Sequence, residues 1–519
     1  MGGHSIIENS IAEPVAEPGS ITLAPLSVAR SKTSNALNQQ YHISSGAILF
    51  KRRGIQYGQH KVAMLMHPGE LGQSRFSALM IDKCALVPLA ACAFAVIIFP
   101  LLDFFNPSSQ EEVASGVARL ENRIFWPAMV AISVVLVAKN RPRLAKLTWP
   151  PHIICLLAFL AFAGASVLWA FRPESSLIRF VQQVMVVTSC VLPAMLAART
   201  ADIMRGLFLC FVLALFLNIP FVISGTATVI NNGVTLVDIG CPGYFAGKNY
   251  LGECAAIGFL LSLYEMIYRG RRRVLGIIGG VIATYLVYVS NSKTALGLAF
   301  VAPFLAGIVL IARKITGISL AFILLSIPLC YVVLSSVSHY NMNLLSYKVY
   351  GDATFTGRTI IWDFVQNEID RRPFLGWGYE SFWLVPGSPV FSDAGGWVRQ
   401  MPNGHNGYYD TMLDMGYLGL AFLLVFISAT LHAVGRVADR DPARAWLVLS
   451  LALYVLIYNF LESLLMRGFE FEWLVFLILA AEIGRYWQPL PLRRAAYRSR
   501  SSRAGSPGHL ARPADAPAA

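Results

Sequence analysis

Long apolar segments alternate with short polar ones along most of this chain. Twelve of them have lengths near the ~20 residues that a helix needs to cross a bilayer, whereas a barrel strand needs only ~10. They run approximately over 84–103, 122–138, 151–171, 178–198, 206–224, 251–268, 274–290, 295–312, 316–337, 409–434, 444–465 and 471–485. The pattern therefore predicts an all-α polytopic membrane protein with about twelve transmembrane helices.

One polar loop, between spans nine and ten, is much longer than the others and covers residues 338–408. A loop of this length is usually functional or disordered, and its aromatic content favours a folded one. Within it, 357–370 predicts an amphipathic helix that ends at Pro373, followed by a turn at 376–379. The remaining regions are a polar N-terminal extension (1–83), spans one to nine (84–337), spans ten to twelve (409–485) and a basic tail (486–519).

Composition agrees with a membrane protein, because 56% of the 519 residues are hydrophobic and 14% are charged. Soluble proteins carry roughly 25% charged residues. The net charge of +13 is explained by Lys and Arg in the loops on one side of the membrane, and we expect no nucleic-acid partner. This positive-inside bias predicts cytoplasmic termini and places the long loop outside the membrane.

Three cations are predicted at the outer membrane boundary, where the charge bias does not explain them: Lys248, Lys293 and Arg358. Small polar neighbours, Asn249 and Ser292, add hydrogen-bond donors. Together they are suited to an anionic head group such as pyrophosphate. The alternative for each lysine is a side chain that extends from a span end to the interface.

His405 lies at the end of the long loop, directly before span ten. Its neighbours Asn406, Tyr408 and Asp410 are placed to orient or polarise the ring, as a general base requires. The alternative is a loop histidine without chemistry. A metal site is disfavoured because no second histidine lies within helical reach, and we expect neither a metal nor a cofactor.

Three aromatic residues of the loop, Trp377, Tyr379 and Trp383, have two open interpretations. They can stack on sugar rings, or they can form the core of the folded loop.

Several of these motifs resemble one known group of proteins. The stretches 243–252, 290–297, 357–383, 404–408 and 416–419 are similar in order and spacing to the O-antigen ligase and Wzy-type polysaccharide polymerase superfamily. The nearest variant is the exopolysaccharide polymerases of the rhizobial type. The resemblance covers 243–419 together with the general arrangement of the spans.

The resemblance implies a GT-C-like fold and a glycosyltransferase that uses undecaprenyl-pyrophosphate-linked glycans at the outer side of the inner membrane. It implies pyrophosphate binding by Lys248 and Lys293, with Arg358 as an additional candidate, and activation of the acceptor hydroxyl by His405. Two departures stand out. Gly247 stands where the superfamily often has histidine, and Lys293 stands where arginine is common. Of lysine and arginine, only arginine can bind phosphate in a bidentate way.

The expected function is metal-independent polymerisation of lipid-linked repeat units into exopolysaccharide, at the periplasmic face of the bacterial inner membrane. One alternative function is that of an O-antigen ligase, which transfers glycan to lipid A-core. An alternative from another class is a transporter or flippase of polysaccharide precursors, and a third alternative is a non-catalytic scaffold. Expected partners are undecaprenyl-pyrophosphate-linked oligosaccharide, membrane lipids, and a flippase and chain-length regulator of the same pathway.

Overall fold

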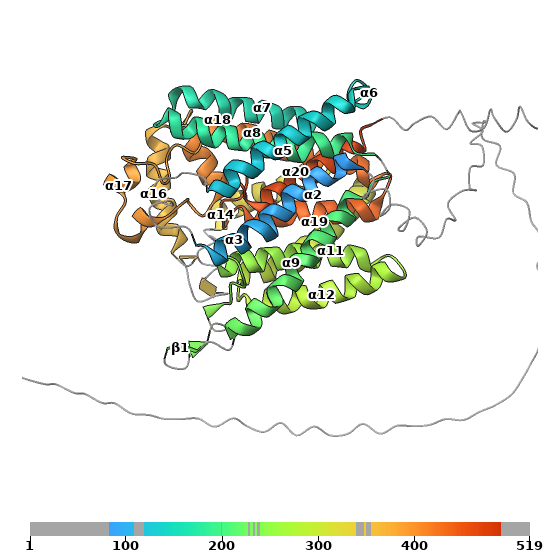
Figure 1. The fold of residues 1–519 in the computed structure, drawn as a ribbon. Coiled ribbons are helices and arrows are strands. Elements are labelled where there is room, and N and C mark those ends of the chain that lie inside the picture. The colour runs from blue at the N-terminus through green and yellow to red at the C-terminus, as the bar shows by residue number, and fades with distance from the viewer. Residues whose placement is uncertain are drawn as a thin grey trace, which may run out of the picture. The chain divides into compact units, whose positions relative to one another are not determined.

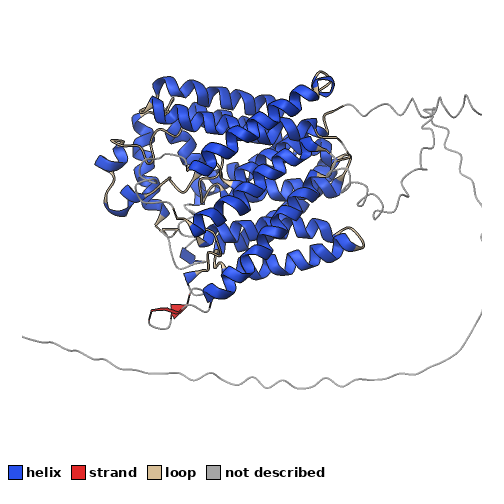
Figure 2. Ribbon diagram, viewed as in Figure 1, coloured by secondary structure: helices blue, strands red, loops and turns tan. Residues whose placement is uncertain are grey.

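The computed structural model describes residues 82–107, 119–198, 200–226, 229–231, 234–235, 239–338, 347–348, 354–355 and 357–488. Almost all of the regular structure in these ranges is helical, which confirms the predicted fold class (Figure 2). One small antiparallel hairpin, β1 (Val229–Asn231) with β2 (Val234–Thr235), is the exception. The predicted N-terminal extension and basic tail lie almost entirely outside the described residues.

Each of the twelve predicted spans corresponds to a helix (Figure 1). In chain order these are α2 (Lys83–Ala93) continued by η1 (Phe94–Ile98) and α3 (Phe99–Phe105), α5 (Leu120–Lys139), α7 (Pro151–Ser166) continued by η2 (Val167–Trp169), α8 (Pro173–Leu196), α9 (Ile203–Thr226), α11 (Lys248–Met266), α12 (Arg271–Val289), α13 (Lys293–Thr316), α14 (Leu320–Ser338), α18 (Gly407–Ala438), α19 (Pro442–Tyr458) and α20 (Phe471–Arg485). The remaining helical segments are α6 (Arg141–Leu144), α16 (Arg358–Arg371), α17 (Pro389–Asp393) and η3 (Gly396–Gln400).

Nine helical segments of the described chain are long and apolar enough to cross a membrane. The other three predicted spans are α11, α19 and α20, and they are the most enclosed. Nearly every side chain of α19 and α20 is buried. A helix that is apolar all round occupies the interior of a bundle, and α19 contacts α13, α18, α11 and α20 accordingly. The chain is thus a multi-pass helical membrane protein.

The long loop packs at one end of the bundle, where α16 and α17 lie opposite α6 (Figure 1). The predicted amphipathic helix is α16, and it packs against α18. Its buried side chains join a small core of their own, which contains Ile361, Val365, Ile369, Trp377, Phe382, Trp383, Val390, Ala394, Val398 and Leu413. Trp377, Tyr379 and Trp383 are all buried. Of the two interpretations of these aromatics, the structure favours core packing.

The loop is joined to α18 through an interruption of that helix at Gly416, where φ is +65° and ψ −169°. The opened turn exposes backbone carbonyls of α18 to the loop. Trp377 N donates to Leu413 O at 2.9 Å, and Gly378 N donates to Asp414 O at 2.7 Å. The motifs around 376–379 and 416–419 therefore meet in space, and they fix the loop to the helix that follows His405.

Candidate functional site

His405 lies in a tight turn directly before α18. The Asn406 side chain caps this helix, because its Oδ1 accepts from the backbone N–H of Tyr408 and Tyr409. The preceding Gly404 N–H donates to both carboxylate oxygens of Asp410, at 3.1 and 3.0 Å. His405 itself has a φ of +48°, a left-handed conformation that histidine tolerates better than most side chains. The turn is thus held from both sides of the histidine.

Glu462 is the centre of the site. Its Oε2 lies 2.6 Å from His405 Nδ1. Its Oε1 accepts from the Arg358 guanidinium at 2.6 Å and from Asn249 Nδ2 at 3.1 Å. Three residues from separate parts of the sequence, all predicted as site residues, therefore converge on one carboxylate.

The charge state of Glu462 sets which ring nitrogen of His405 donates to it. Burial alone raises the pKa of a carboxyl group, but the hydrogen bond from His405 and the Arg358 charge outweigh it and lower the pKa of Glu462. An ionised carboxylate only accepts hydrogen bonds, so His405 Nδ1 carries the proton that it donates. This leaves Nε2 as the ring nitrogen that can take up a proton.

The connection between α19 and α20 brings Glu462 to the histidine. Asn459, which is fully buried, accepts from Leu464 N and Leu465 N and so closes the turn that carries Glu462. Gly407 N donates to the carbonyls of Asn459 and Glu462, at 2.8 and 3.2 Å. Direct backbone bonds therefore join the start of α18 to this connection and fix His405 opposite Glu462.

A second polar cluster supports the turn from the side of the loop. Asp410 Oδ1 accepts from Trp383 Nε1 at 2.7 Å, and its Oδ2 accepts from the Ser463 hydroxyl. Arg467 lies 3.2 Å from Asp410 and 3.4 Å from Asp414. The indole of the loop core and the two residues on the α19–α20 connection are thereby linked to the same carboxylate that holds Gly404.

The two predicted lysines lie near a neighbouring turn, between α12 and α13. Lys248 Nζ donates to the carbonyl of Ile239 at 2.8 Å. A side chain added at Gly240 would meet both Lys248 Cδ and the Ser290 carbonyl within 2.5 Å, so this lysine packs beside the turn that leads to exposed Lys293. Asn249, adjacent to Lys248, bridges from here to Glu462.

The remaining predicted residues have structural contacts. Ser292 is buried and packs against Gly252 of α11. A Cβ added at Gly252 would lie 2.7 Å from the Cβ of Ser292. Tyr408 donates its hydroxyl to the carbonyl of Leu456 at 2.8 Å and so joins α18 to α19. Asn406 supports His405 directly, through the helix cap and through its own N–H to Ser463 Oγ.

The sequence did not identify Glu462. The predicted eleventh span extended to residue 465, whereas α19 ends at Tyr458, so Glu462 was counted as part of an apolar segment. A signal was present, because an ionisable residue within a predicted span is by default a candidate functional residue.

The fold and the site define a class: a multi-pass membrane protein with a histidine–carboxylate pair at one end of its helical bundle, beside several cations. Residues 278–424 match the model of the O-antigen ligase family. The exopolysaccharide production protein ExoQ of Rhizobium meliloti (strain 1021) is 26% identical over 314 residues, which cover 55% of this chain and 67% of ExoQ.

The chain is thus similar to the O-antigen ligase family over residues 278–424 and to an exopolysaccharide production protein over about half of its length. This similarity supports a ligase- or polymerase-type function, and with it a glycosyltransferase-like activity on polysaccharide or lipid-linked substrates in a membrane. Lys293, Arg358 and His405 lie within the matched region, whereas Lys248 and Glu462 lie outside it.

Proposed function

We propose that this protein polymerises undecaprenyl-pyrophosphate-linked repeat units into exopolysaccharide, at the periplasmic face of the bacterial inner membrane. The observation that carries the proposal is the pairing of His405 with Glu462, 2.6 Å apart, at the end of the bundle where the long loop packs. The name of the similar protein ExoQ, an exopolysaccharide production protein, favours a polymer as the product.

In the proposed reaction the acceptor sugar hydroxyl oxygen attacks the anomeric carbon of the donor glycan. The bond between that carbon and the pyrophosphate oxygen breaks, and the lipid pyrophosphate leaves with the electron pair. The hydroxyl proton passes to His405 Nε2. The Glu462 carboxylate then stabilises the resulting imidazolium, as the carboxylate of a catalytic triad does.

The contact between Glu462 and Arg358 favours the two lysines over Arg358 as pyrophosphate ligands. Arg358 is committed to Glu462 and to the carbonyl of Leu461, at 2.6 and 2.8 Å, so its positive charge is largely offset by the carboxylate. Lys248 and Lys293 then supply the positive charge that stabilises the leaving pyrophosphate. Direct pyrophosphate binding by Arg358 stays a prediction of the sequence.

The proposed chemistry needs no metal ion, because a lipid pyrophosphate is already a good leaving group and the cations are supplied by side chains. Within the described parts of the chain, no group of three or more His, Cys, Asp or Glu side chains is arranged to hold a metal.

An O-antigen ligase is the second candidate, since the matched family model carries that description. The transporter alternative has less support, because the ionisable cluster described above lies at helix ends and in a connection, whereas transport sites lie near the midplane of the bilayer.

The proposal is tested by reconstituting the purified full-length chain with lipid-linked repeat units extracted from cells that make the polymer. The expected product is a ladder of longer lipid-linked glycans, formed at the same rate with and without EDTA. The absence of elongation contradicts polymerase activity, and a loss of rate in EDTA contradicts metal independence. In cells that lack the chain, normal polymer with uncapped lipid A-core identifies a ligase instead.

A further inference from the structure

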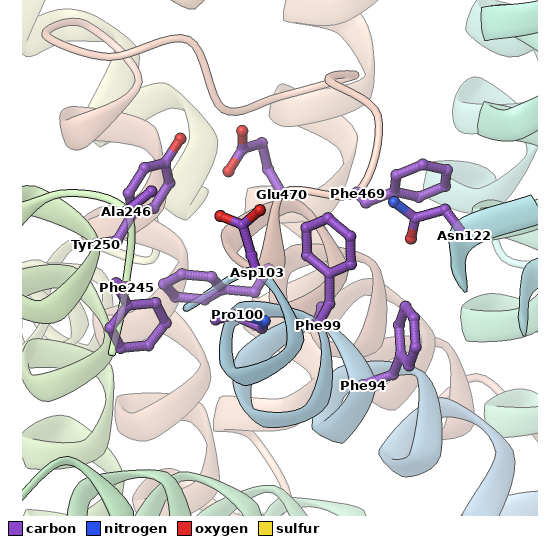
Figure 3. Close-up of a pocket in the computed structure, with 12 residues that line it drawn as sticks. Phe94, Phe99, Pro100, Asp103, Asn122, Phe245, Ala246, Tyr250, Phe469 and Glu470 are labelled. Atoms are coloured by element: carbon purple, nitrogen blue, oxygen red, sulfur yellow. The ribbon is translucent and has the colours of Figure 1, made fainter. Parts of the chain in front are cut away.

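A pocket of about 280 Å³ lies among α3, the start of α11 and the start of α20 (Figure 3). Half of its lining residues are aromatic, and the walls come from four parts of the chain: η1 with α3, the start of α5, the start of α11 with the residues before it, and the start of α20 with the residues before it. The lining residues that carry the argument are Phe99, Asp103, Asn122, Phe245, Tyr250 and Glu470. The volume is close to the lower limit of the ~300–1,000 Å³ typical of small-molecule sites.

Two of the lining residues connect the pocket to the histidine–carboxylate pair. Tyr250 directly follows Asn249, whose amide donates to Glu462. Glu470 ends the same α19–α20 connection that carries Glu462, and burial together with the charges of Glu253 and Glu462 raises its pKa. The pocket is thus joined to the histidine–carboxylate pair through the start of α11 and through the α19–α20 connection.

The polar groups of the pocket identify the chemistry of its occupant. Among the described residues that line it are two carboxyl groups and one amide, from Asp103, Glu470 and Asn122, but no lysine or arginine. Arg119 approaches from outside the lining, where it pairs with Asp103. Such a lining disfavours a pyrophosphate. Carboxyl and amide oxygens accept hydrogen bonds from hydroxyl groups, and aromatic rings supply flat apolar surfaces for the faces of sugar rings.

We propose that this pocket is the acceptor-sugar subsite, in which an uncharged, polyhydroxylated sugar of the acceptor glycan lies between the aromatic walls and directs its hydroxyl group to the histidine–carboxylate pair. Aromatic contact with Phe99 and Tyr250 holds the ring, and Asp103 and Glu470 receive its hydroxyl groups. The proposal rests on the proposed glycosyl transfer and adds the location of one of its two substrates.

Site-directed photo-cross-linking of the full-length chain tests this assignment. Benzoylphenylalanine replaces Phe99 in one variant and Ala246, an exposed lining residue, in a second that is less sensitive to packing. The matched control carries it at Phe304, which is 71% exposed on α13. The probe is the cells' own lipid-linked glycan, labelled by growth on radioactive glucose and accumulated by a His405→Ala change in each variant.

The expected result is radioactive label on the protein after irradiation at position 99 or 246, and little at position 304. Mild acid cleaves a glycosyl pyrophosphate, so label that stays after acid was attached through the sugar. Label that is lost in acid shows that the pocket holds the lipid part of the glycan. If neither position 99 nor position 246 becomes labelled, the pocket holds neither the sugar nor the lipid. Both outcomes overturn the proposal.

Failure of the proposed function has a different signature. In that case cells without the chain still make normal polymer, whatever the cross-linking shows.

Discussion

At the scale of single residues, the position of Glu462 gives His405 a defined tautomer. The carboxylate is ionised and accepts from Nδ1, so catalysis depends on a residue that does not touch the substrate in our account. Glu462 is therefore a positioning residue. Two kinds of change separate this role from a structural one: loss of its charge with its shape retained, and loss of a comparable carboxylate elsewhere.

Glu462→Gln is expected to lower the rate of glycan elongation by about 10²-fold or more, within the range that general-base catalysis contributes. The amide preserves size but no longer fixes the Nδ1–H tautomer, and it removes the charge that stabilises the imidazolium. Elongation by the purified variant, measured across a pH series, also shows a changed pH profile if the role is electrostatic.

The control for this change is Glu368→Gln, which alters a buried carboxylate of α16 paired with Arg371. We expect it to retain elongation within a few-fold. Equal losses in the two variants show that Glu462 acts only through the fold.

Glu470 predicts a pH-dependent stability. Burial, together with the charges of Glu253 and Glu462, raises its pKa to about 8, although Arg467 acts in the opposite direction. Because the folded state holds a proton that the unfolded chain releases above its ordinary pKa of 4.5, stability is greatest at low pH and is lost as the pH rises towards 8. The slope for one proton is at most about 1.4 kcal/mol per pH unit.

Glu470→Gln removes this proton uptake, so the melting temperature of the variant in detergent is expected to fall less between pH 5 and 8. Glu174→Gln, at an exposed position of α8, is the matched control and keeps the slope of the parent chain. Parallel curves for the parent and Glu470→Gln contradict the raised pKa.

At this scale the sequence predicted three of the four residues that meet at the site: His405, Arg358 and Asn249. Their residue types and neighbours carry the chemistry, and this information is local. It did not predict Glu462, since the partner of a histidine is set by tertiary contacts. It also did not predict that Arg358 would bind a carboxylate of its own chain.

At the scale of elements, the join between the long loop and α18 depends on glycine at two positions. Gly416 has a φ of +65°, and an added Cβ would lie 2.2 Å from the Phe374 backbone. Gly376 has the same φ, and its added Cβ would lie 2.5 Å from the Asp414 backbone. Two main chains thus cross at a separation that only glycine permits.

Gly416→Ala is expected to separate the loop from α18 and to displace the turn that carries His405. The clash involves backbone atoms, which cannot move aside as a side chain can. We expect a clear loss of elongation activity and a lower melting temperature. Protease digestion of the purified chain measures the opening directly, as faster cleavage between α16 and α18.

The control for this change is Gly297→Ala on α13, where an added Cβ meets nothing within 4 Å. It is expected to match the parent chain in activity and protease resistance. A Gly416→Ala protein that is as active and as resistant as the parent contradicts the tight crossing.

The sequence predicted most elements because a span of about 20 apolar residues is a strong signal. The weakest boundary was the end of α19, where apolar residues continue past Tyr458 into a buried connection. Hydropathy does not distinguish a buried helix from a buried turn. For this reason Glu462 falls in a predicted span, although the structure places it in the connection that forms the site.

At the scale of the whole described bundle, a network of buried charges joins helix ends far from the site. Glu265 lies at the opposite end of α11 from Asn249, and it accepts from Arg272 at 2.5 Å and from Arg205. The full set is Asp202, Arg205, Glu265, Arg272, Arg444, Glu482 and Arg485. These arginines lie where the charge bias of the sequence expects cytoplasmic cations, and the structure gives them carboxylate partners.

Asp202→Asn is expected to destabilise the protein by about 3–5 kcal/mol, because Arg444, 2.8 Å away and almost fully buried, keeps its charge without its main partner. Thermal unfolding in detergent measures the loss. The elongation activity of the folded fraction stays near that of the parent, since the network is remote from His405.

The control is Asp439→Asn, which breaks an Arg–Asp pair of similar length, 2.9 Å to Arg313, at an exposed position. Exposed pairs contribute about 0–1 kcal/mol, so a small effect is expected. Equal destabilisation by the two variants contradicts the importance of burial in the network.

The most direct test of the central claim is a His405→Ala change in cells that lack the natural chain, with polymer and lipid-linked repeat units sized by gel and mass spectrometry. His432→Ala, on the same helix α18 and bonded there to Ser319, is the matched control and is expected to restore normal polymer. For His405→Ala we predict no polymer and an accumulation of single lipid-linked repeat units. Polymer of normal length and amount made without the His405 imidazole would contradict its role as the base.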